Sequence, residues 1–379
     1  MIRSRSDLGL ARRVVVKIGS SLLADEKHGI RQDVIDRVVD ELQSCMGSGV
    51  DVVMVTSGSV ALGRVQLGWL NRTLSVHEKQ AAAAIGQPML MSAYAKSFAR
   101  YGRTVAQMLL TKDDLRHRRR YLNTTNTSET LFSAGVVPIV NENDTVVVAE
   151  IKFGDNDSLG ALVSLVVDAD LLVMLTDVDG LYDKNPTKHA DAKRVGVIEH
   201  LNEEHVAMAG DAGSAFGTGG MGSKISAARV ATTGGVSAAI ISGKESGKLT
   251  RLLAGEDEGT LFLCGVDRWT RRKHWILEVL SPKGEIHVDA GAEQAIVGKG
   301  SSLLPVGVKA VSGRFDKGEC VEIVGAEGVI ARGLCNYTSE ELKRIMGHAS
   351  SDIESILGYR DFSAVIHRDN LVLCREEAD

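Results

Sequence analysis

The sequence predicts an α/β domain built on a mainly parallel sheet, followed by a smaller β-rich domain. Between residues 12 and 265, short apolar runs alternate with helical patterns, as in a parallel sheet with helices on both faces. Between residues 276 and 357, short β-like runs lie between glycines, which is typical of a small antiparallel barrel or sandwich. The length of 379 residues also favours two domains over one.

The composition is that of an ordinary globular protein. Hydrophobic residues make up 44% of the chain, charged residues make up 25%, and the net charge is −5, so the chain lacks the overall basic excess of a nucleic-acid-binding protein. No apolar run approaches the roughly 20 residues that span a membrane. The five cysteines are widely spaced, which indicates reduced thiols rather than disulfides or a zinc site. We therefore expect a cytoplasmic protein. Residues 1–13 are basic without a signal peptide's apolar stretch and are expected to form a short disordered arm.

The strands expected in the first domain are its short apolar runs. They are Val14–Ile18, Val50–Val55, Val105–Leu110, Val136–Val140, Leu171–Thr176 and Ala238–Ile241. Helical patterns lie between these runs, at Val34–Cys45, Gln80–Arg100, Asn126–Ala134 and Ser158–Val167. Gly86 and Pro88 predict a break or kink within the second of these helices.

The strands expected in the second domain are shorter. They are Ile276–Leu280, Glu285–Val288, Val308–Val311, Cys320–Val324, Val329–Gly333 and Ala364–His367. One helix is expected at Ser339–Met346, with Ser339 as its N-cap. The highly charged segment Arg268–Trp275 is expected to join the two domains.

Two segments place lysine, glycine and serine directly after apolar strands. Val14–Leu23 carries Lys17 near the end of its strand, where a lysine is costly unless it meets an anion. Val55–Gly63 presents Ser57 and Gly58 where a helix begins, and backbone N–H groups at such a position bind anions. Each segment alone also fits an ordinary turn, so the pair is more informative than either member.

The most informative segment is Asn141–Val163, in which NEND and GDND flank a predicted hairpin. So many acidic and amide side chains at both ends of a hairpin exceed what turn chemistry needs. Aspartate and asparagine suit an ammonium group, and an aspartate also orients lysines around a transferring phosphoryl group. Asp157 stands where a helix is expected to begin, so a capping role remains an alternative.

Two further segments suit a nucleotide. The apolar run Leu171–Thr176 ends in Thr176 and Asp177, and ligands of open α/β sheets lie at the carboxyl ends of strands. Gly217–Lys224 offers glycines, backbone N–H groups and a lysine to phosphates, although its residue order differs from the Walker A loop and a plain surface loop is an alternative. The DVDG sequence lacks the later ligands of a calcium loop. Together the five segments indicate ATP-dependent phosphoryl transfer to a small molecule that they do not name.

In these segments the chain resembles the glutamate 5-kinases, a branch of the amino acid kinase family with a C-terminal PUA domain. The motifs VVVKIGSS, VTSGSVALG, VNEND, KFGDND, LTDVDGLY and GTGGMGSK follow the family's order and spacing, and the resemblance extends from about Arg13 to Leu373. It implies an αβα sandwich around a mainly parallel sheet, plus a small β-rich PUA-like barrel. It also implies that ATP and L-glutamate react to L-glutamyl 5-phosphate and ADP, the first step of L-proline synthesis.

The resemblance further implies individual roles. Lys17, Asp157 and Lys224 are the implied catalytic residues, with Asp157 orienting the two lysines. The residues implied to bind glutamate are Ser57, Asp144 and Asn156. The residues implied to bind ATP are Lys17, Thr176, Asp177, Thr218, Gly219, Gly220, Met221, Gly222, Ser223 and Lys224. Magnesium is expected to bind mainly through the nucleotide, L-proline to act as a feedback inhibitor, and the chain to form a homo-oligomer.

Three alternatives remain open at this point. The chain fits a related kinase of N-acetylglutamate, aspartate or carbamate, although NEND with GDND and the PUA-like region favour free glutamate. An RNA-binding protein with a degenerate kinase domain is a second alternative, because PUA domains often bind RNA. The intact Lys17, Asp157 and Lys224 and the acidic net charge disfavour it, so RNA is the less favoured partner. A structural protein is the third.

Overall fold

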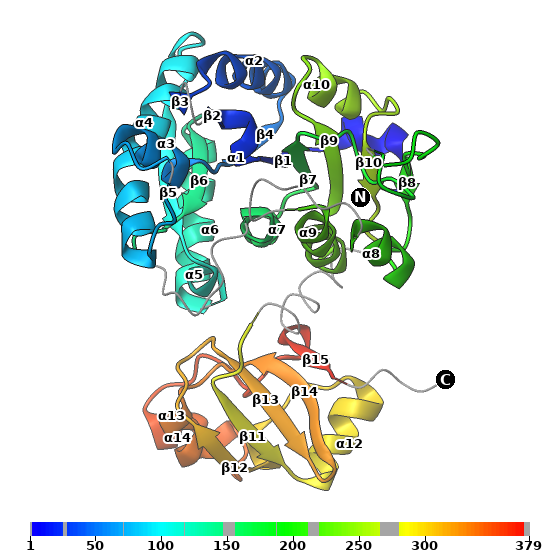
Figure 1. The fold of residues 1–379 in the computed structure, drawn as a ribbon. Helices are drawn as coiled ribbons and strands as arrows, with labels where there is room; N and C mark the ends of the chain where they lie inside the picture. Colours follow the sequence, from blue (N-terminus) through cyan, green and yellow to red (C-terminus); the bar gives the residue numbers. More distant parts are fainter. Residues whose placement is uncertain are drawn as a thin grey trace. The chain divides into compact units, whose positions relative to one another are not determined.

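The computed structural model describes residues 2–25, 29–70, 72–116, 118–146, 156–186, 188–210, 220–265 and 280–374. They form two compact units, which we describe separately (Figure 1). The expected linker Arg268–Trp275 and most of the expected strand Ile276–Leu280 lie outside the described residues. The predicted boundaries at residues 265 and 276 therefore stay predictions.

The N-terminal unit contains an eight-stranded sheet of order β5-β6-β4-β1-β7-β9-β10-β8. Its strands are β5 (Val105–Leu110), β6 (Val137–Glu142), β4 (Asp51–Val55), β1 (Arg13–Ile18), β7 (Leu171–Thr176), β9 (Ser237–Ser242), β10 (Thr260–Phe262) and β8 (Val197–Ile198). Neighbours from β5 to β9 pair in parallel, whereas β10 runs antiparallel to β9. A separate two-stranded sheet joins β2 (Ala24–Asp25) to β3 (Gly29–Ile30). All six predicted strands of this domain are confirmed.

Helices cover both faces of the large sheet, which confirms the predicted layering. The helices that lie wholly or mainly in this unit are α1 (Ser20–Leu23), α2 (Gln32–Gly47), α3 (Ser59–Gln66), α4 (Val76–Ala99), α5 (Lys112–Arg116), α6 (Arg118–Ser133), α7 (Asn156–Val166), α8 (Glu203–Gly210), α9 (Met221–Thr233) and α10 (Lys248–Leu253). Residues Arg116–Asn123, at the end of α5 and the start of α6, group with the C-terminal unit. In Figure 1, α2 and α10 lie on one side of the sheet, and α7 and α9 lie on the other.

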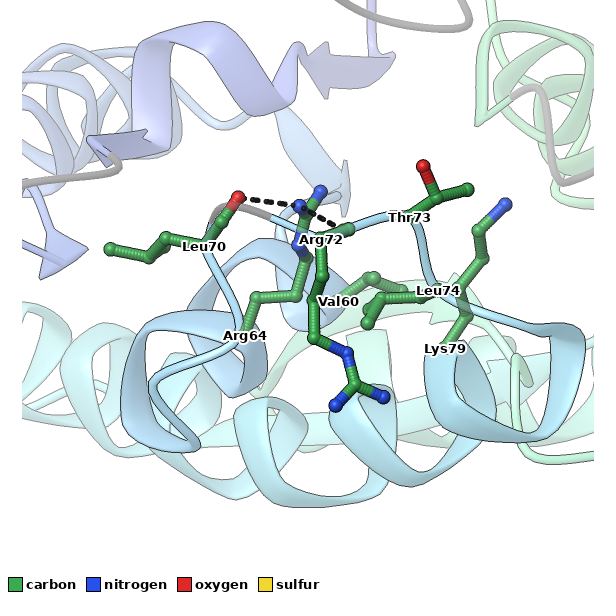
Figure 2. A pocket seen from close by; sticks show the side chains of 7 residues that line it. All are labelled: Val60, Arg64, Leu70, Arg72, Thr73, Leu74 and Lys79. Atoms are coloured by element: carbon green, nitrogen blue, oxygen red, sulfur yellow. Dashed lines mark hydrogen bonds between the residues drawn. The ribbon is translucent and has the colours of Figure 1, made fainter.

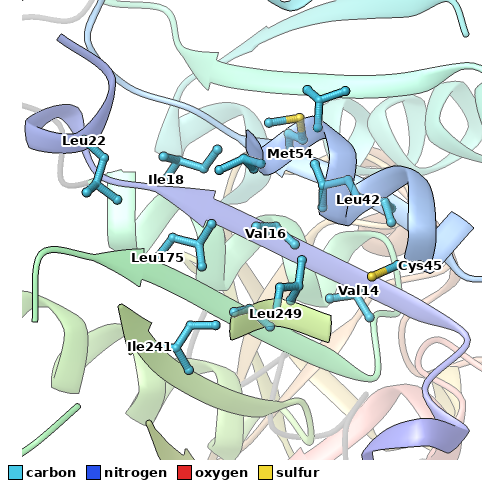
Figure 3. Packing of buried hydrophobic residues seen from close by; sticks show 14 of the residues in the cluster. Val14, Val16, Ile18, Leu22, Leu42, Cys45, Met54, Leu175, Ile241 and Leu249 are labelled. Atoms are coloured by element: carbon cyan, nitrogen blue, oxygen red, sulfur yellow. The ribbon is translucent and has the colours of Figure 1, made fainter. Parts of the chain in front are cut away.

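Side chains of β1 alternate between these two layers, as the pleat of a strand requires. Figure 3 shows Val14, Val16 and Ile18 in one hydrophobic cluster with Leu42 of α2 and Leu249 of α10. Lys17 lies between Val16 and Ile18 in the chain, so its side chain points to the opposite layer, toward α7. The strand therefore buries three aliphatic side chains on one face and presents a lysine on the other.

The prediction for the alanine-rich helix was a break or kink at Gly86 and Pro88, and a break there is wrong, because α4 continues from Val76 to Ala99 through Pro88. Gly86 instead allows close packing between two helices. A Cβ atom at Gly86 would lie 1.9 Å from the carbonyl oxygen of Ser59, so only glycine lets α4 pack this closely on α3. The helix starts with a capping box between Ser75 and Glu78.

The expected disordered arm at the N-terminus is also wrong. Residues Arg5–Leu10 form a 3₁₀ helix, and the side chains of Ile2 and Leu8 are buried. The Arg5 guanidinium donates hydrogen bonds to four backbone carbonyls, those of Gly196, Glu256, Glu258 and Gly259. These contacts fix the arm because they satisfy a planar group with several donors in one place.

The C-terminal unit contains a five-stranded sheet of order β12-β11-β13-β14-β15. Its strands are β11 (Gly284–Val288), β12 (Val308–Gly313), β13 (Cys320–Gly325), β14 (Gly328–Leu334) and β15 (Leu371–Leu373), and its α-helices are α12 (Ala290–Lys299), α13 (Ser339–Ile345) and α14 (Ile353–Leu357). The β-rich character is confirmed, although β11 and β13 pair in parallel. Two details differ from expectation. Thr338 rather than Ser339 caps α13, and Ala364–His367 contributes only an isolated bridge at Ile366.

Candidate active site

The predicted site segments lie at the carboxyl ends of neighbouring parallel strands. Along the sheet, β6 leads to Asp144, β4 to Ser57, β1 carries Lys17, and β7 leads to Thr176 and Asp177. Parallel strands end at the same edge, so these residues share that edge in the order of the strands. The fold thus turns segments far apart in sequence into one continuous row.

A buried cluster of opposite charges lies at the centre of this row. Asp157 is 0% exposed at the start of α7, and its carboxylate lies between two lysines. The Lys17 ammonium lies 2.5 Å from Asp157 Oδ1, and the Lys224 ammonium of α9 lies 3.4 Å from Oδ2. Ser223 donates a hydrogen bond of 2.7 Å to Oδ2. The three predicted catalytic residues are therefore brought into direct contact.

The electrostatics of this cluster favour the ionised carboxylate. Burial by itself raises the pKa of Asp157, but the ammonium groups of Lys17 and Lys224 and the hydroxyl of Ser223 outweigh burial and lower that pKa below its ordinary value. The described ion pairs of the cluster join two ammonium groups to one carboxylate. Two ammonium groups at one position suit an anionic ligand such as a phosphate.

The turn after β4 is shaped by Gly58, whose φ angle of 105° falls in the left-handed region. This turn starts α3, so backbone N–H groups of its first residues point toward the sheet edge. The Ser57 hydroxyl donates a 2.9 Å hydrogen bond to the carbonyl of Ile18. Its proton is thus already used within the protein, and the backbone N–H groups are the better donors for a ligand here.

The turn after β6 holds a chain of polar side chains. Ser59 donates to Asp144 Oδ2 at 3.1 Å, and Asn141 donates to Gln87 Oε1 at 2.8 Å. Partial burial raises the pKa of Asp144, and the Ser59 hydrogen bond only partly offsets this. The sequence analysis did not select Gln87. The available signal was one amide inside the apolar run AAAAIGQPML, because a buried amide needs partners.

Asn156 precedes Asp157 at the start of α7. Its side-chain oxygen Oδ1 is buried and accepts no hydrogen bond. A buried acceptor without a partner costs about 1–3 kcal/mol. A ligand that brings an N–H donor to this position would remove that penalty.

Some of the residues predicted to bind ATP lie in the described part of the chain, and others lie outside it. Thr176 is buried at the end of β7 and donates to Asp177 Oδ1 at 3.1 Å, while Asp177 is exposed. Gly220 caps α9, and Met221, Gly222, Ser223 and Lys224 form its first turn. Thr218 and Gly219 lie outside the described residues, as do Gly154 and Asp155 of GDND.

A cavity of about 440 Å³ lies beside α3 and α4 (Figure 2). Arg64, Arg72 and Lys79 line it, but the arginines are engaged. Arg64 donates to the carbonyls of Leu70 and Arg72, and Arg72 pairs with Glu78. These bonds hold the connection between the two helices, and the cavity contains none of the predicted site residues.

The described residues include no cluster of three or more histidine, cysteine, aspartate or glutamate side chains that could hold a metal ion. Within the same parts of the chain, no helix is long and apolar enough to cross a membrane.

Comparison with known proteins adds to this geometry. Residues 12–242 match the amino acid kinase family, and residues 284–357 match the PUA domain. The chain belongs to the amino acid kinase family. Membership of a kinase family implies that the chain uses ATP.

Several curated members of this amino acid kinase family align over almost their whole length. A glutamate 5-kinase of Trichlorobacter lovleyi is 49% identical over 97% of this chain and 98% of its own. A glutamate 5-kinase of Geobacter sulfurreducens is 48% identical over 97% and 98%, and one of Chromohalobacter salexigens is 47% identical over 98% of each. The similarity therefore includes both the sheet edge and the C-terminal unit.

Proposed function

We propose that this protein is a kinase that transfers the γ-phosphoryl group of ATP to the side-chain carboxylate of L-glutamate. The products are L-glutamyl 5-phosphate and ADP, and the reaction is the first step of L-proline biosynthesis. The observation that carries this proposal is the buried cluster of Asp157 between Lys17 and Lys224 at the carboxyl edge of the sheet. The names of the aligned relatives support glutamate as the acceptor.

The chemistry needs positioned cations more than covalent participation by the protein. An oxygen of the glutamate side-chain carboxylate attacks the γ-phosphorus. The bond to the bridging oxygen breaks, and its electron pair leaves with ADP. Lys17 and Lys224 neutralise negative charge on the transferring oxygens, while Asp157 holds both ammonium groups in place. Magnesium enters with the nucleotide, whose phosphate oxygens are the hard ligands it prefers.

Glutamate is held on the side of β4 and β6. Its α-ammonium group is placed between Asp144 and the Asn156 oxygen, which is buried and lacks a partner. Its α-carboxylate is placed at the turn of Ser57 and Gly58. ATP lies on the opposite side of Lys17, along Thr176, Asp177 and the residues from Thr218 to Lys224. This division follows the order of the strands.

Further parts of the proposal concern organisation and control. The kinase domain extends over residues 12–265 and the PUA-like domain over residues 276–357. The enzyme is cytoplasmic, where its substrates are made, and it assembles as a homo-oligomer. L-proline inhibits it, because proline retains the amine and α-carboxylate through which glutamate is held.

The deciding experiment traps the acyl phosphate. Hydroxylamine converts L-glutamyl 5-phosphate to a hydroxamate, which is measured together with ADP release. Wild-type protein should form the hydroxamate with L-glutamate and much less product with N-acetylglutamate, aspartate or carbamate. Lys17→Met should lose about 10²–10³ in turnover while remaining folded. Faster turnover of any of the three other acceptors would refute the assignment.

A further inference from the structure

Gln87 lies in the middle of α4 and is not among the residues assigned to the substrates. It is 8% exposed, and its side chain makes two hydrogen bonds. Its Oε1 accepts from Asn141 at 2.8 Å, and its Nε2 donates to Gln107 Oε1 of β5 at 3.0 Å. An amide buried in an apolar helix is costly without such partners, so its presence here calls for a reason.

The direction of each bond in this group is determined by one backbone contact. The N–H of Glu142 donates to Asn141 Oδ1 at 2.9 Å, so the Nδ2 of Asn141 must face the other way. That nitrogen then meets Gln87 Oε1 at 2.8 Å and Ser59 Oγ at 3.5 Å. Because Asn141 presents a donor to the Ser59 oxygen, the one proton of Ser59 is left for Asp144, which accepts it at 3.1 Å.

Without Gln87, this chain of hydrogen bonds would lose the 2.8 Å bond that the Asn141 Nδ2 group donates. Asn141 would keep only the 3.5 Å contact for its Nδ2 group, and a buried donor would lack a good acceptor. Its amide would then move toward Ser59 or turn. Either change disturbs the hydroxyl that holds Asp144.

We infer that Gln87 is a positioning residue for glutamate, which acts through Asn141 and Ser59 to hold the Asp144 carboxylate where the substrate ammonium binds. The inference rests on the proposed function, since it assumes that Asp144 receives the α-ammonium group of glutamate. Gln87 contacts neither substrate. Its effect is therefore expected on glutamate affinity and not on ATP affinity or on the phosphoryl transfer at Lys17 and Lys224.

The test compares Gln87→Met with wild type in the hydroxamate assay. Methionine keeps the length of the side chain but accepts no strong hydrogen bond. We expect the KM for glutamate to rise about three- to tenfold, as for the loss of one buried hydrogen bond. The KM for ATP should stay within about twofold and kcat within about threefold. An unchanged glutamate KM in the folded variant would overturn the inference.

Two control variants separate positioning from stability. Gln107→Met removes the other partner of Gln87 but keeps the bond to Asn141, so its glutamate KM should stay within about twofold of wild type. Leu90→Ala shortens a fully buried side chain of the same helix and should lower the melting temperature with little change in glutamate KM. If either control raises the glutamate KM as much as Gln87→Met, general loosening of α4 explains the effect and the inference fails.

The reference variant Asp144→Asn distinguishes this inference from the proposed function. If Asp144→Asn raises the glutamate KM but Gln87→Met does not, only the role of Gln87 is refuted. If wild type forms no glutamyl hydroxamate, the proposed function and this inference fail together.

Discussion

Replacing Asp157 by asparagine should destabilise the protein more than any other single charge change at the site. The substitution keeps the shape of the side chain but removes the carboxylate charge that pairs with the ammonium groups of Lys17 and Lys224. At an effective dielectric constant of about 20, charges separated by 2.5 and 3.4 Å attract by about 7 and about 5 kcal/mol. Desolvation of the buried groups offsets much of this attraction. Removal of one partner from a buried pair typically destabilises by about 3–5 kcal/mol, and we expect a loss in this range.

The assay is urea unfolding of the ligand-free protein, followed by circular dichroism. A matched control is Asp191→Asn, because Lys184 and Asp191 also approach to 2.5 Å but the Asp191 side chain is 77% exposed. That change should alter the free energy of unfolding by less than about 1 kcal/mol. A loss for Asp157→Asn as small as that of the control would refute the electrostatic account of the cluster.

The difference in the free energy of unfolding between wild type and Asp157→Asn should depend on pH in one direction. Folding lowers the pKa of Asp157 below its ordinary value of 3.8, because the two lysines outweigh burial. A group of this kind stabilises the folded state above its unfolded pKa, and that stability is lost as the pH falls through the folded pKa. The difference between wild type and Asp157→Asn should therefore be constant near neutral pH and shrink in acid. A difference that grows in acid would contradict this reasoning.

In variants of Asp157 and Lys224, kcat and the free energy of unfolding should not change in parallel. Asp157→Asn should lower kcat by about 10²–10³, because the lysines lose their fixed positions. The double variant Asp157→Asn with Lys224→Met also removes one of the two ammonium groups that face each other across position 157, so it should recover part of the stability but none of the activity. Recovery of kcat in the double variant would show that Lys224 does not act on the transferring group.

The remaining predictions concern glutamate, proline and the C-terminal unit. Asp144→Asn should raise the KM for glutamate at least about tenfold with little change for ATP, because a charged hydrogen bond to the ammonium group is lost; initial rates at varied concentrations of each substrate measure this, and a change confined to ATP would contradict the site. Inhibition by L-proline should be relieved by glutamate in the same assay, and inhibition independent of glutamate would indicate a separate site. A chain that ends before Trp275 should retain measurable kinase activity, because the described site residues all lie in the N-terminal unit. Its oligomer size or its inhibition by proline should change. A shortened chain that is folded but inactive would refute this prediction.

The sequence was sufficient to predict the main sheet because its strands are long and apolar. All six runs between Val14 and Ile241 are strands, and parallel order then predicted that their polar carboxyl ends share one edge. Strands β8 and β10 were missed, since two and three residues are too few to form a recognisable alternation. The same parallel order brings the described residues that were predicted for the site to one edge of the sheet, whereas their roles stay predictions.

Other features depend on contacts between distant segments and leave little local signal. The N-terminal arm is basic and short, yet Arg5 binds carbonyls about 190 to 250 residues further along the chain. Gly86 has the local signature of a helix break, but its lack of a side chain serves the contact with Ser59. Gln87 is one amide among alanines, and its importance becomes visible only with Asn141 and Gln107 beside it. In each case a tertiary contact overrides the local preference.

The order of the strands also helps to compare the four possible acceptors, which differ in length and in charge. Asp144 lies beyond β6 and Lys17 lies in β1, and β4 lies between these strands, so the backbones of β6 and β1 are about 10 Å apart. In the proposed binding mode, a substrate pairs its ammonium group with Asp144 and presents a carboxylate near Lys17, so the two groups must stand at opposite ends of an extended chain. Glutamate has such a chain, whereas aspartate is one methylene shorter. N-acetylglutamate has the length but no ammonium charge, and it would leave the partly buried Asp144 carboxylate unpaired. Carbamate has neither the length nor the separate ammonium group, so glutamate is the one acceptor among the four that fits the proposed binding mode at both ends.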